Sequence, residues 1–278
     1  MSQNNLTCIA LGSRRLRSSS LCHLELLLVA LGLGTVSAAW ASRPAIVEVN
    51  ATKVVAPVTT RVFGNNVLAY LAPQGQTDEG HRIYSDRGAG LWDPESASPV
   101  PEYVELAKLA GITVARWPGG CGVHHYDWHR TVGPVNQRPN QRFGLSEFLV
   151  WCRVVGAEPL ITLADYWGNH NDAADLVEYL NAPVGANPNG GKDWAVVRAS
   201  EGHKEPWKVV WFEYGNETYH GDHQGKHKMT GEEYGRRFLL YRRAMKAVDS
   251  GVKLGALVQD ESEWARQAVR IAGPEMDF

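Results

Sequence analysis

Apolar residues recur along this chain in two alternating patterns, helical spacing over longer segments and short runs rich in β-branched residues. Helical spacing predicts helices over residues 101–110, 146–155, 172–181, 230–248 and 262–272. The short runs predict strands over residues 45–49, 53–58, 61–66, 112–117, 157–163, 209–214 and 253–258, with residues 276–278 as the beginning of another. The longest helix is expected to begin with a capping box, because Glu233 follows Thr230 at the required spacing.

The alternation of strands and helices predicts parallel strands joined by right-handed crossovers. Two architectures have such connections, an eight-stranded barrel and a doubly wound open sheet. No glycine-rich phosphate-binding motif follows any predicted strand, which disfavours the nucleotide-binding form of the open sheet. Polar residues of functional type instead follow several different strands, as they do in a TIM barrel.

We therefore expect an α/β fold, a (β/α)8 TIM barrel over residues 62–278, preceded by N-terminal strands in residues 42–61. The barrel is expected to be incomplete, because the chain reaches only the beginning of its sixth strand. Residues 73–99 are rich in Gly, Pro, Asp and Ser and are predicted to form a long loop.

Composition narrows the class of protein. Hydrophobic residues make up 44% of the chain, which is enough for a packed core. The formal net charge is −2, so no polyanion partner is indicated and nucleic-acid binding is not expected. Outside the first forty residues, Cys121 and Cys152 are too few for a disulfide framework. Cys152 is expected as a small buried hydrophobic residue, with a bridge to Cys121 as the less favoured alternative.

The N-terminal segment has the pattern of a signal peptide over residues 1–41. A basic region is followed by the apolar run 24–36 and by Ala39-Trp40-Ala41, which fits a cleavage site. The run is too short for an ordinary membrane span, so export without stable membrane association is expected, to the periplasm or as a secreted protein. A retained N-terminal anchor is the alternative, because Glu25 interrupts the run.

The segment Trp211-Phe212-Glu213-Tyr214-Gly215-Asn216-Glu217 is the most informative for chemistry. A hydrophobic strand ends in Gly-Asn-Glu, which places a carboxyl group at the edge where barrel active sites form. Glycoside hydrolysis requires such a proton donor together with a second carboxylate across the sugar. Glu217 is therefore the candidate acid/base, and Asn216 a candidate contact to a sugar hydroxyl. A polar cap on the next loop is the alternative interpretation.

A second polar segment follows an earlier strand. Arg116 ends that strand before a Pro-Gly-Gly turn, which lets the backbone pass close to a ligand. Trp117 and Trp128 are candidate apolar faces for sugar rings, or else core aromatics. Asn65, at the end of the first barrel strand, is a further candidate for substrate binding.

Two other functions remain open from the residues. Two groups of histidines have spacings compatible with metal binding: His220, His223 and His227, and His124, His125 and His129. The first group lies in a polar, glycine-containing loop rather than on a helix or rigid turn. No metal and no cofactor are therefore expected. A chain with Trp-rich loops and one candidate carboxylate is also compatible with a module that binds carbohydrate without cleaving it.

Several motifs together resemble glycoside hydrolase family 51, the retaining α-L-arabinofuranosidases with (β/α)8 barrels. In chain order these motifs are RWPGG, YDW, VGP, FGLSEFLVWCRVVGAEPLI, ADLVEYLN and VRASEGHKEPWKVVWFEYGNE. The segments EEY, AMKAVD and VKLGAL continue the same order, and the resemblance covers residues 62–278. It implies that Glu217 is the acid/base, that Asn216 contacts the sugar and that Arg116 belongs to the active site.

The resemblance also implies what this chain lacks. The nucleophile of the family is a Glu at the end of the seventh strand, which the chain does not reach, so this piece alone is expected to be inactive. Glu213 is not a substitute, because four strand residues separate it from Glu217 by about 13 Å of backbone, against the roughly 5 Å between carboxyl groups that a retaining enzyme needs.

Two departures from the family concern substrate recognition. Shortly after Phe-Gly the family usually has a glutamate that contacts arabinose, but in this chain Phe63-Gly64 is followed by Asn65 and no carboxylate comes after it over residues 65–69. Cys121 stands where the family often has Asn. The resemblance therefore predicts a hydrolase acting on plant-type polysaccharides or oligosaccharides, most simply an arabinofuranosidase. Related glycosidases directed at glucan or xylan, and a non-catalytic carbohydrate-binding fragment, are the alternatives.

Overall fold

A computed structural model describes residues 56, 59–67, 77–78, 81–82, 88–138, 142–222, 227–259 and 262–278. The chain divides into two units, residues 1–57 and 58–278, and the description below concerns the second. The predicted strands over 45–49 and 53–58 and the segment 1–41 lie outside the described residues. No helix among the residues described is both long and apolar enough to cross a membrane.

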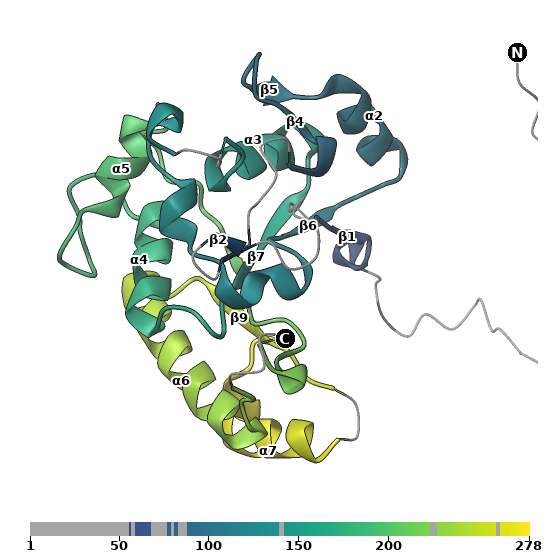
Figure 1. The fold of residues 1–278 in the computed structure, drawn as a ribbon, viewed down its shortest axis with the longest axis vertical. Coiled ribbons are helices and arrows are strands. Elements are labelled where there is room, and N and C mark those ends of the chain that lie inside the picture. The colour runs from purple at the N-terminus through teal and green to yellow at the C-terminus, as the bar shows by residue number, and fades with distance from the viewer. Residues whose placement is uncertain are drawn as a thin grey trace, which may run out of the picture. The chain divides into compact units, whose positions relative to one another are not determined.

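Five parallel strands form the wall of a TIM barrel (Figure 1). They lie side by side in chain order, as barrel strands do: β1 (Gly64–Asn66), β6 (Val114–Trp117), β7 (Glu158–Leu163), β8 (Trp211–Tyr214) and β9 (Lys253–Ala256). Residues 276–278 lie beside β9, where Asp277 N donates to Leu254 O and Ala256 N donates to Phe278 O, both at 3.1 Å. The predicted incomplete barrel is thus confirmed among the described residues.

The five predicted helices are all present with small changes at their ends. They are α2 (Pro101–Leu109), α3 (Leu145–Val155), α4 (His170–Asn181), α6 (Gly231–Val248) and α7 (Glu263–Ala272). Helix α4 packs on α6 and α6 on α7, so these three line one side of the sheet (Figure 1). Thr230 Oγ1 accepts a hydrogen bond from Glu233 N at 3.1 Å, one of the two bonds of the expected capping box. The Glu233 carboxylate is paired with His227 at 3.4 Å.

Three local features differ from the sequence expectation. The predicted strand over 61–66 is shorter, because Thr60–Val62 form a 3₁₀ helix. The predicted loop over 73–99 contains two small antiparallel pairs of two-residue strands, β2 (Thr77–Asp78) with β3 (His81–Arg82) and β4 (Trp92–Asp93) with β5 (Ser98–Pro99). Helix α5 (Trp194–Ser200) was not predicted at all. Elements this short carry too few residues to show a hydrophobic period.

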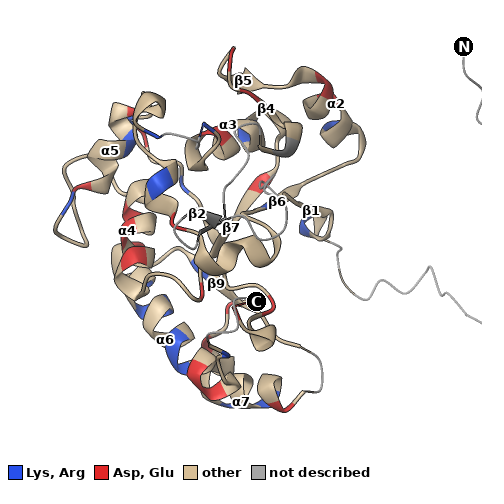
Figure 2. Cartoon of the chain, in the orientation of Figure 1, with Lys and Arg blue, Asp and Glu red and all other residues tan. Residues whose placement is uncertain are grey.

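Strand side chains alternate between a buried outer face and a partly open inner face. In β8, Phe212 and Tyr214 are fully buried. The Tyr214 ring packs against aromatic rings of α6, with its centroid 4.5 Å from that of Tyr241. Glu213, between Phe212 and Tyr214 in sequence, points to the other face and is only partly buried. Figure 2 shows acidic and basic residues interspersed along α6 and α7. Because apolar side chains take the outer face, the inner face is left for polar chemistry.

Candidate active site

Polar side chains from β1, β6 and β8 meet near the carboxyl ends of these strands. Arg116 Nε donates to Glu213 Oε2 at 2.5 Å, and both side chains are less than one fifth exposed, at 17% and 18%. The same guanidinium donates from Nη1 to Asn66 Oδ1 at 3.2 Å and from Nη2 to Asn216 Oδ1 at 3.1 Å. Arg116 thus ties three strands together at the edge where barrel active sites form.

Asn66, and not Asn65, belongs to this cluster. In the parallel register Asn66 lies opposite Arg116, whereas Asn65 lies opposite Ala115, whose side chain is fully buried on the outer face. Alternation of side chains along a strand therefore turns Asn65 away from Arg116. The amide of Asn66 also fits against Gly119, where a Cβ atom would lie 2.1 Å from Asn66 Oδ1. Asn66 is therefore the asparagine of β1 that contacts Arg116, and a role of Asn65 in substrate binding stays a prediction.

The turn after β8 determines where Glu217 lies. Gly215 has φ +82°, and a Cβ atom there would come within 2.5 Å of Thr218 Oγ1 and 2.9 Å of Asp165 Oδ2. Glu217 itself adopts a left-handed conformation, with φ 46° and ψ 36°, which a residue with a side chain adopts only at a cost. Residues in this conformation cluster at functional sites, although Ala97, Asn187 and Lys208 of this chain also have positive φ.

Cys121 joins Glu217 to the rest of the cluster. The Cys121 thiol donates to Glu217 Oε2 at 3.4 Å, and Asn216 Nδ2 donates to Cys121 Sγ at 3.5 Å. A continuous set of contacts therefore runs from Arg116 through Asn216 and Cys121 to Glu217. Both cysteines beyond the N-terminal segment are free thiols, so the alternative of a Cys121–Cys152 bridge is wrong.

A buried ionic pair lies behind Cys121. His124 Nδ1 is 2.8 Å from Asp165 Oδ1, and both side chains are at most 1% exposed. Thr218 Oγ1 donates to the other oxygen of Asp165 at 2.6 Å. Burial lowers the pKa of His124, but hydrogen bonds and charge interactions with Asp165 and Cys121 outweigh it and raise the pKa to about 9. The His124 ring is therefore an imidazolium at neutral pH.

Sequence reasoning missed three members of this arrangement: Asn66, His124 and Asp165. Asn66 was discoverable from strand parity, and Asp165 from its position directly after β7 and Ala164. For His124 the spacing of histidines suggested only a possible metal ligand, and nothing in the sequence indicated its pairing with Asp165.

The two candidate tryptophans do not lie at Glu217. Trp117 is fully buried, stacked on Phe148 at 5.4 Å, because it alternates with the inward-facing Arg116 and so points to the helices. Its ring offers no face to a sugar, so the expectation of a substrate contact is corrected to a core position. Trp128 is 4% exposed and stacks on His129 at 4.1 Å.

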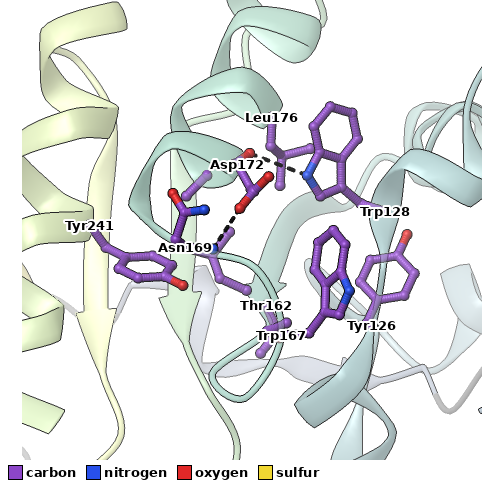
Figure 3. A pocket seen from close by; sticks show the side chains of 11 residues that line it. Tyr126, Trp128, Thr162, Trp167, Asn169, Asp172, Leu176 and Tyr241 are labelled. Carbon is purple, nitrogen blue, oxygen red and sulfur yellow. Dashed lines mark hydrogen bonds between the residues drawn. The ribbon is translucent and has the colours of Figure 1, made fainter. Parts of the chain in front are cut away.

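Trp128 lines a separate pocket between α4 and the loops (Figure 3), where its Nε1 donates to the backbone oxygen of Asp172 at 3.2 Å. Tyr126, Trp167 and Tyr241 also line this pocket. Its internal volume is about 20 Å³, room for about one water molecule and too small for a sugar ring.

The two histidine groups do not form metal sites within the described part of the chain. His129 pairs with Asp127 at 2.9 Å and His227 with Glu233 at 3.4 Å, while His223 lies outside the described residues. No three His, Cys, Asp or Glu side chains among the residues described are arranged to hold a metal ion.

Comparison with known proteins decides the family. The family model described as the α-L-arabinofuranosidase 1 domain matches residues 106–275, more than half of the chain. The chain belongs to glycoside hydrolase family 51. Its similarity to the family includes β6 to α7 and therefore every residue of the cluster except Asn66.

Individual relatives agree with this assignment. The chain is 34% identical to an intracellular exo-α-(1→5)-L-arabinofuranosidase of Acetivibrio thermocellus, over 56% of this chain and 31% of the relative. It is 31% identical to an enzyme of the same name from Streptomyces lividans, over 76% of this chain and 32% of the relative. The solved GH51 α-L-arabinofuranosidase from Thermotoga petrophila superposes with a TM-score of 0.65 at 30% identity, over 82% of this chain and 46% of that structure. The chain thus spans about a third of the curated relatives and just under half of the solved structure.

The expectation of export is wrong. Both curated relatives above are named as intracellular enzymes, which contradicts a secreted or periplasmic location. The segment 1–41, on which that expectation depended, lies outside the described residues.

Proposed function

We propose that the protein containing this chain is a retaining glycoside hydrolase of the α-L-arabinofuranosidase type, with Glu217 as its acid/base. One observation carries the proposal: Glu217 follows β8 in a left-handed turn, at the end of the sheet where Arg116 and Asn216 also meet. Family membership supplies the reaction class, and this geometry supplies the residue.

In the proposed reaction, Glu217 protonates the leaving glycosidic oxygen while a carboxylate nucleophile attacks the anomeric carbon from the opposite side. Glu217 then takes a proton from the water that hydrolyses the glycosyl-enzyme intermediate. The nucleophile is proposed to come from a part of the protein beyond these residues, because four strand residues separate Glu213 from Glu217 by about 13 Å of backbone, against the roughly 5 Å between carboxyl groups that a retaining enzyme needs. Asn216, whose amide is fixed by Arg116 and Cys121, is proposed to bind a sugar hydroxyl.

The proposed substrate is a terminal α-L-arabinofuranosyl group. Two relatives carry the name exo-α-(1→5)-L-arabinofuranosidase, and this supports arabinofuranosides as the first compounds to assay. A panel of aryl glycosides, with xyloside and glucoside beside the arabinofuranoside, tests this choice on the full-length protein. Turnover of the xyloside or glucoside in preference to the arabinofuranoside would assign the protein to a related specificity.

The role of Glu217 is tested by Glu217→Gln in the full-length protein. We expect kcat on aryl arabinofuranosides with poor leaving groups to fall by about 10²–10⁴-fold, because protonation of the leaving oxygen is lost. The loss is expected to be smaller for strongly activated leaving groups, which depart without protonation. Glu232→Gln, at an exposed carboxylate on α6, is the matched control and should leave turnover unchanged. Unchanged turnover in Glu217→Gln would refute the assignment.

A further inference from the structure

The turn that carries Glu217 is bonded to its surroundings through the next residue, Thr218. The Thr218 side chain is fully buried, and its Oγ1 donates to Asp165 Oδ2 at 2.6 Å. The main-chain oxygen of Thr218 accepts a hydrogen bond from the Tyr166 hydroxyl at 3.0 Å. Two consecutive residues of the loop after β7 therefore hold the residue after Glu217, one by its side chain and the other by its main chain.

Asp165 and Tyr166 are themselves fixed by bonds to other elements. Asp165 is fully buried, and its Oδ1 is bonded to His124 Nδ1 at 2.8 Å. The Tyr166 hydroxyl accepts from Met229 N at 3.2 Å, just before α6, and Tyr166 N donates to His124 O at 3.1 Å. The two residues that hold Thr218 are thus anchored to the 3₁₀ helix that contains His124 and to the start of α6.

The backbone of Glu217 requires such support. Its left-handed conformation, with φ 46° and ψ 36°, is costly and persists only where the surrounding structure holds it in place. Within the turn, His220 N donates to Glu217 O at 2.8 Å and Gly221 N donates to Thr218 O at 3.1 Å. These two bonds close the turn on itself, whereas the bonds from Asp165 and Tyr166 tie it to neighbouring elements of the barrel.

We propose that Asp165 and Tyr166 are positioning residues for the acid/base: by holding Thr218 from two sides they fix the left-handed turn and with it the direction of the Glu217 carboxyl group. This inference rests on the proposed function. Both residues act through Thr218 and not on the substrate. Proton transfer requires the carboxyl group within hydrogen-bond reach of the leaving oxygen, so a displacement of about 1 Å is expected to slow it by about 100-fold.

A positioning role and a purely structural role differ in how the rate depends on the leaving group. A displaced acid slows the departure of a phenyl group, which needs a proton, far more than that of a dinitrophenyl group, which leaves as an anion. Partial unfolding lowers the rate on both substrates in the same proportion. The ratio of kcat/KM for dinitrophenyl arabinofuranoside to kcat/KM for phenyl arabinofuranoside therefore reports the position of Glu217.

Two variants of the full-length protein each remove one bond to the turn. Thr218→Val removes the bond to Asp165, whose own replacement would also leave the buried His124 charge without its partner. We expect the kcat/KM ratio to rise by about 10–100-fold in Thr218→Val and less in Tyr166→Phe. Thr218→Ser restores the hydroxyl group and should return the ratio toward the wild-type value. Tyr166 is only partly buried, so Tyr166→Phe gives a result even if Thr218→Val does not fold. An unchanged ratio in either folded variant would overturn the proposal.

Thr131→Val is the matched control for loss of a buried hydroxyl group. Thr131 is 1% exposed, and its Oγ1 is bonded to Trp128 O at 2.9 Å and to the Tyr126 hydroxyl at 2.8 Å rather than to the turn after β8. Its loss should lower the stability of the protein and leave the kcat/KM ratio unchanged. A rise in Thr131→Val equal to that in Thr218→Val would mean that any buried hydroxyl has this effect, and positioning would be rejected.

Amide hydrogen exchange tests the hold on the turn without any substrate. The amides of His220 and Gly221, which are bonded within the turn, should exchange at least about tenfold faster in Thr218→Val and in Tyr166→Phe. Amides of α3 should keep their wild-type rates. Wild-type exchange in the turn of both variants would overturn the proposal. If the wild-type protein cleaves none of the aryl glycosides, the proposed function fails instead, and exchange still decides whether Asp165 and Tyr166 hold the turn.

Discussion

Two arginine–glutamate pairs in this barrel have the same chemistry but different surroundings. Arg138 and Glu147 are 3% and 8% exposed, and two parallel hydrogen bonds at 2.9 and 3.0 Å join them. Arg116 and Glu213 are more open, at 17% and 18%, and one bond of 2.5 Å joins them. The first pair connects a loop to α3, whereas the second lies at the carboxyl edge of the sheet.

The difference is visible in the remaining bonds of each pair. Arg138 donates also to the backbone oxygen of Thr131, and Glu147 accepts from the backbone N of Gly144, so this pair holds main chain. Arg116 uses its other nitrogens for the side chains of Asn66 and Asn216, so it holds side chains that a ligand can meet. The buried pair therefore connects main-chain segments, and the open pair holds side chains to which the proposed function assigns a role.

Arg138→Met is expected to have the largest effect on stability. It leaves the Glu147 carboxylate buried without its partner, which lowers the free energy of unfolding by about 3–5 kcal/mol. Urea denaturation of wild type and variant measures the change. The double variant Arg138→Met/Glu147→Leu should recover most of the loss, because no unpaired charge remains. A loss below about 1 kcal/mol in the single variant would remove the distinction between the two pairs.

Arg116→Met should show the reverse, a large effect on turnover and a small one on stability. Misplacement of Asn216 is expected to lower kcat/KM on arabinofuranosides by about hundredfold in the full-length protein. The free energy of unfolding should change by about 1 kcal/mol or less, because water can reach the Glu213 carboxylate. Strong destabilisation without loss of turnover would reverse the roles assigned to the two pairs.

The His124–Asp165 pair combines features of both, since it is buried and yet adjoins Cys121. Its folded-state pKa of about 9 lies above the ordinary 6.5, so the contribution to stability is complete below pH 6.5 and lost as pH rises through 9. We expect a decrease of about 3 kcal/mol in the free energy of unfolding across this window. Thermal unfolding between pH 6 and 10 measures it, and Asp165→Asn should flatten the dependence. An unchanged slope in that variant would exclude the pair as its source.

Tyr234→Phe is expected to have the smallest effect on the free energy of unfolding. It tests a buried side chain that, like the Arg138–Glu147 pair, binds main-chain atoms but carries no charge. The Tyr234 hydroxyl donates to Tyr214 O and accepts from Leu257 N, both at 2.8 Å, so it also holds main chain. Its removal should cost about 1 kcal/mol in unfolding free energy, as for an uncharged hydrogen bond. A cost as large as that of Arg138→Met would show that main-chain attachment, rather than buried charge, sets the stability.

The alternation of strands and helices was predictable because each element from α2 to α7, apart from α5, buries one apolar face. Helix starts were predictable too where a capping residue is present, as at Thr230 and Ser262. The position of Glu217 followed from the same reasoning, because a strand that ends in Gly-Asn-Glu delivers polar groups to one edge of the sheet. Strand parity alone is enough to turn Trp117 and Asn65 away from the cluster, because each of them alternates with a residue of the inner face.

The contacts around Cys121 were not predictable from local pattern. Cys121 and Glu217 are 96 residues apart, and His124 and Asp165 are 41 apart, so each contact depends on how neighbouring βα units are placed. The small strand pairs β2–β3 and β4–β5 were missed for a different reason. Two-residue strands are stabilised by their surroundings rather than by a periodic sequence.

The left-handed backbone at Glu217 means that selection for stability and selection for turnover favour different residues at this position. An ordinary side chain pays about 1 kcal/mol or more to hold φ near 46°, a cost that glycine avoids and asparagine reduces. A library screened only for heat resistance should therefore accumulate Glu217→Gly and Glu217→Asn, each relaxing the turn while discarding the carboxylate. Persistence of glutamate in a second library, screened for turnover as well, would measure how strongly turnover is selected against the relaxed turn.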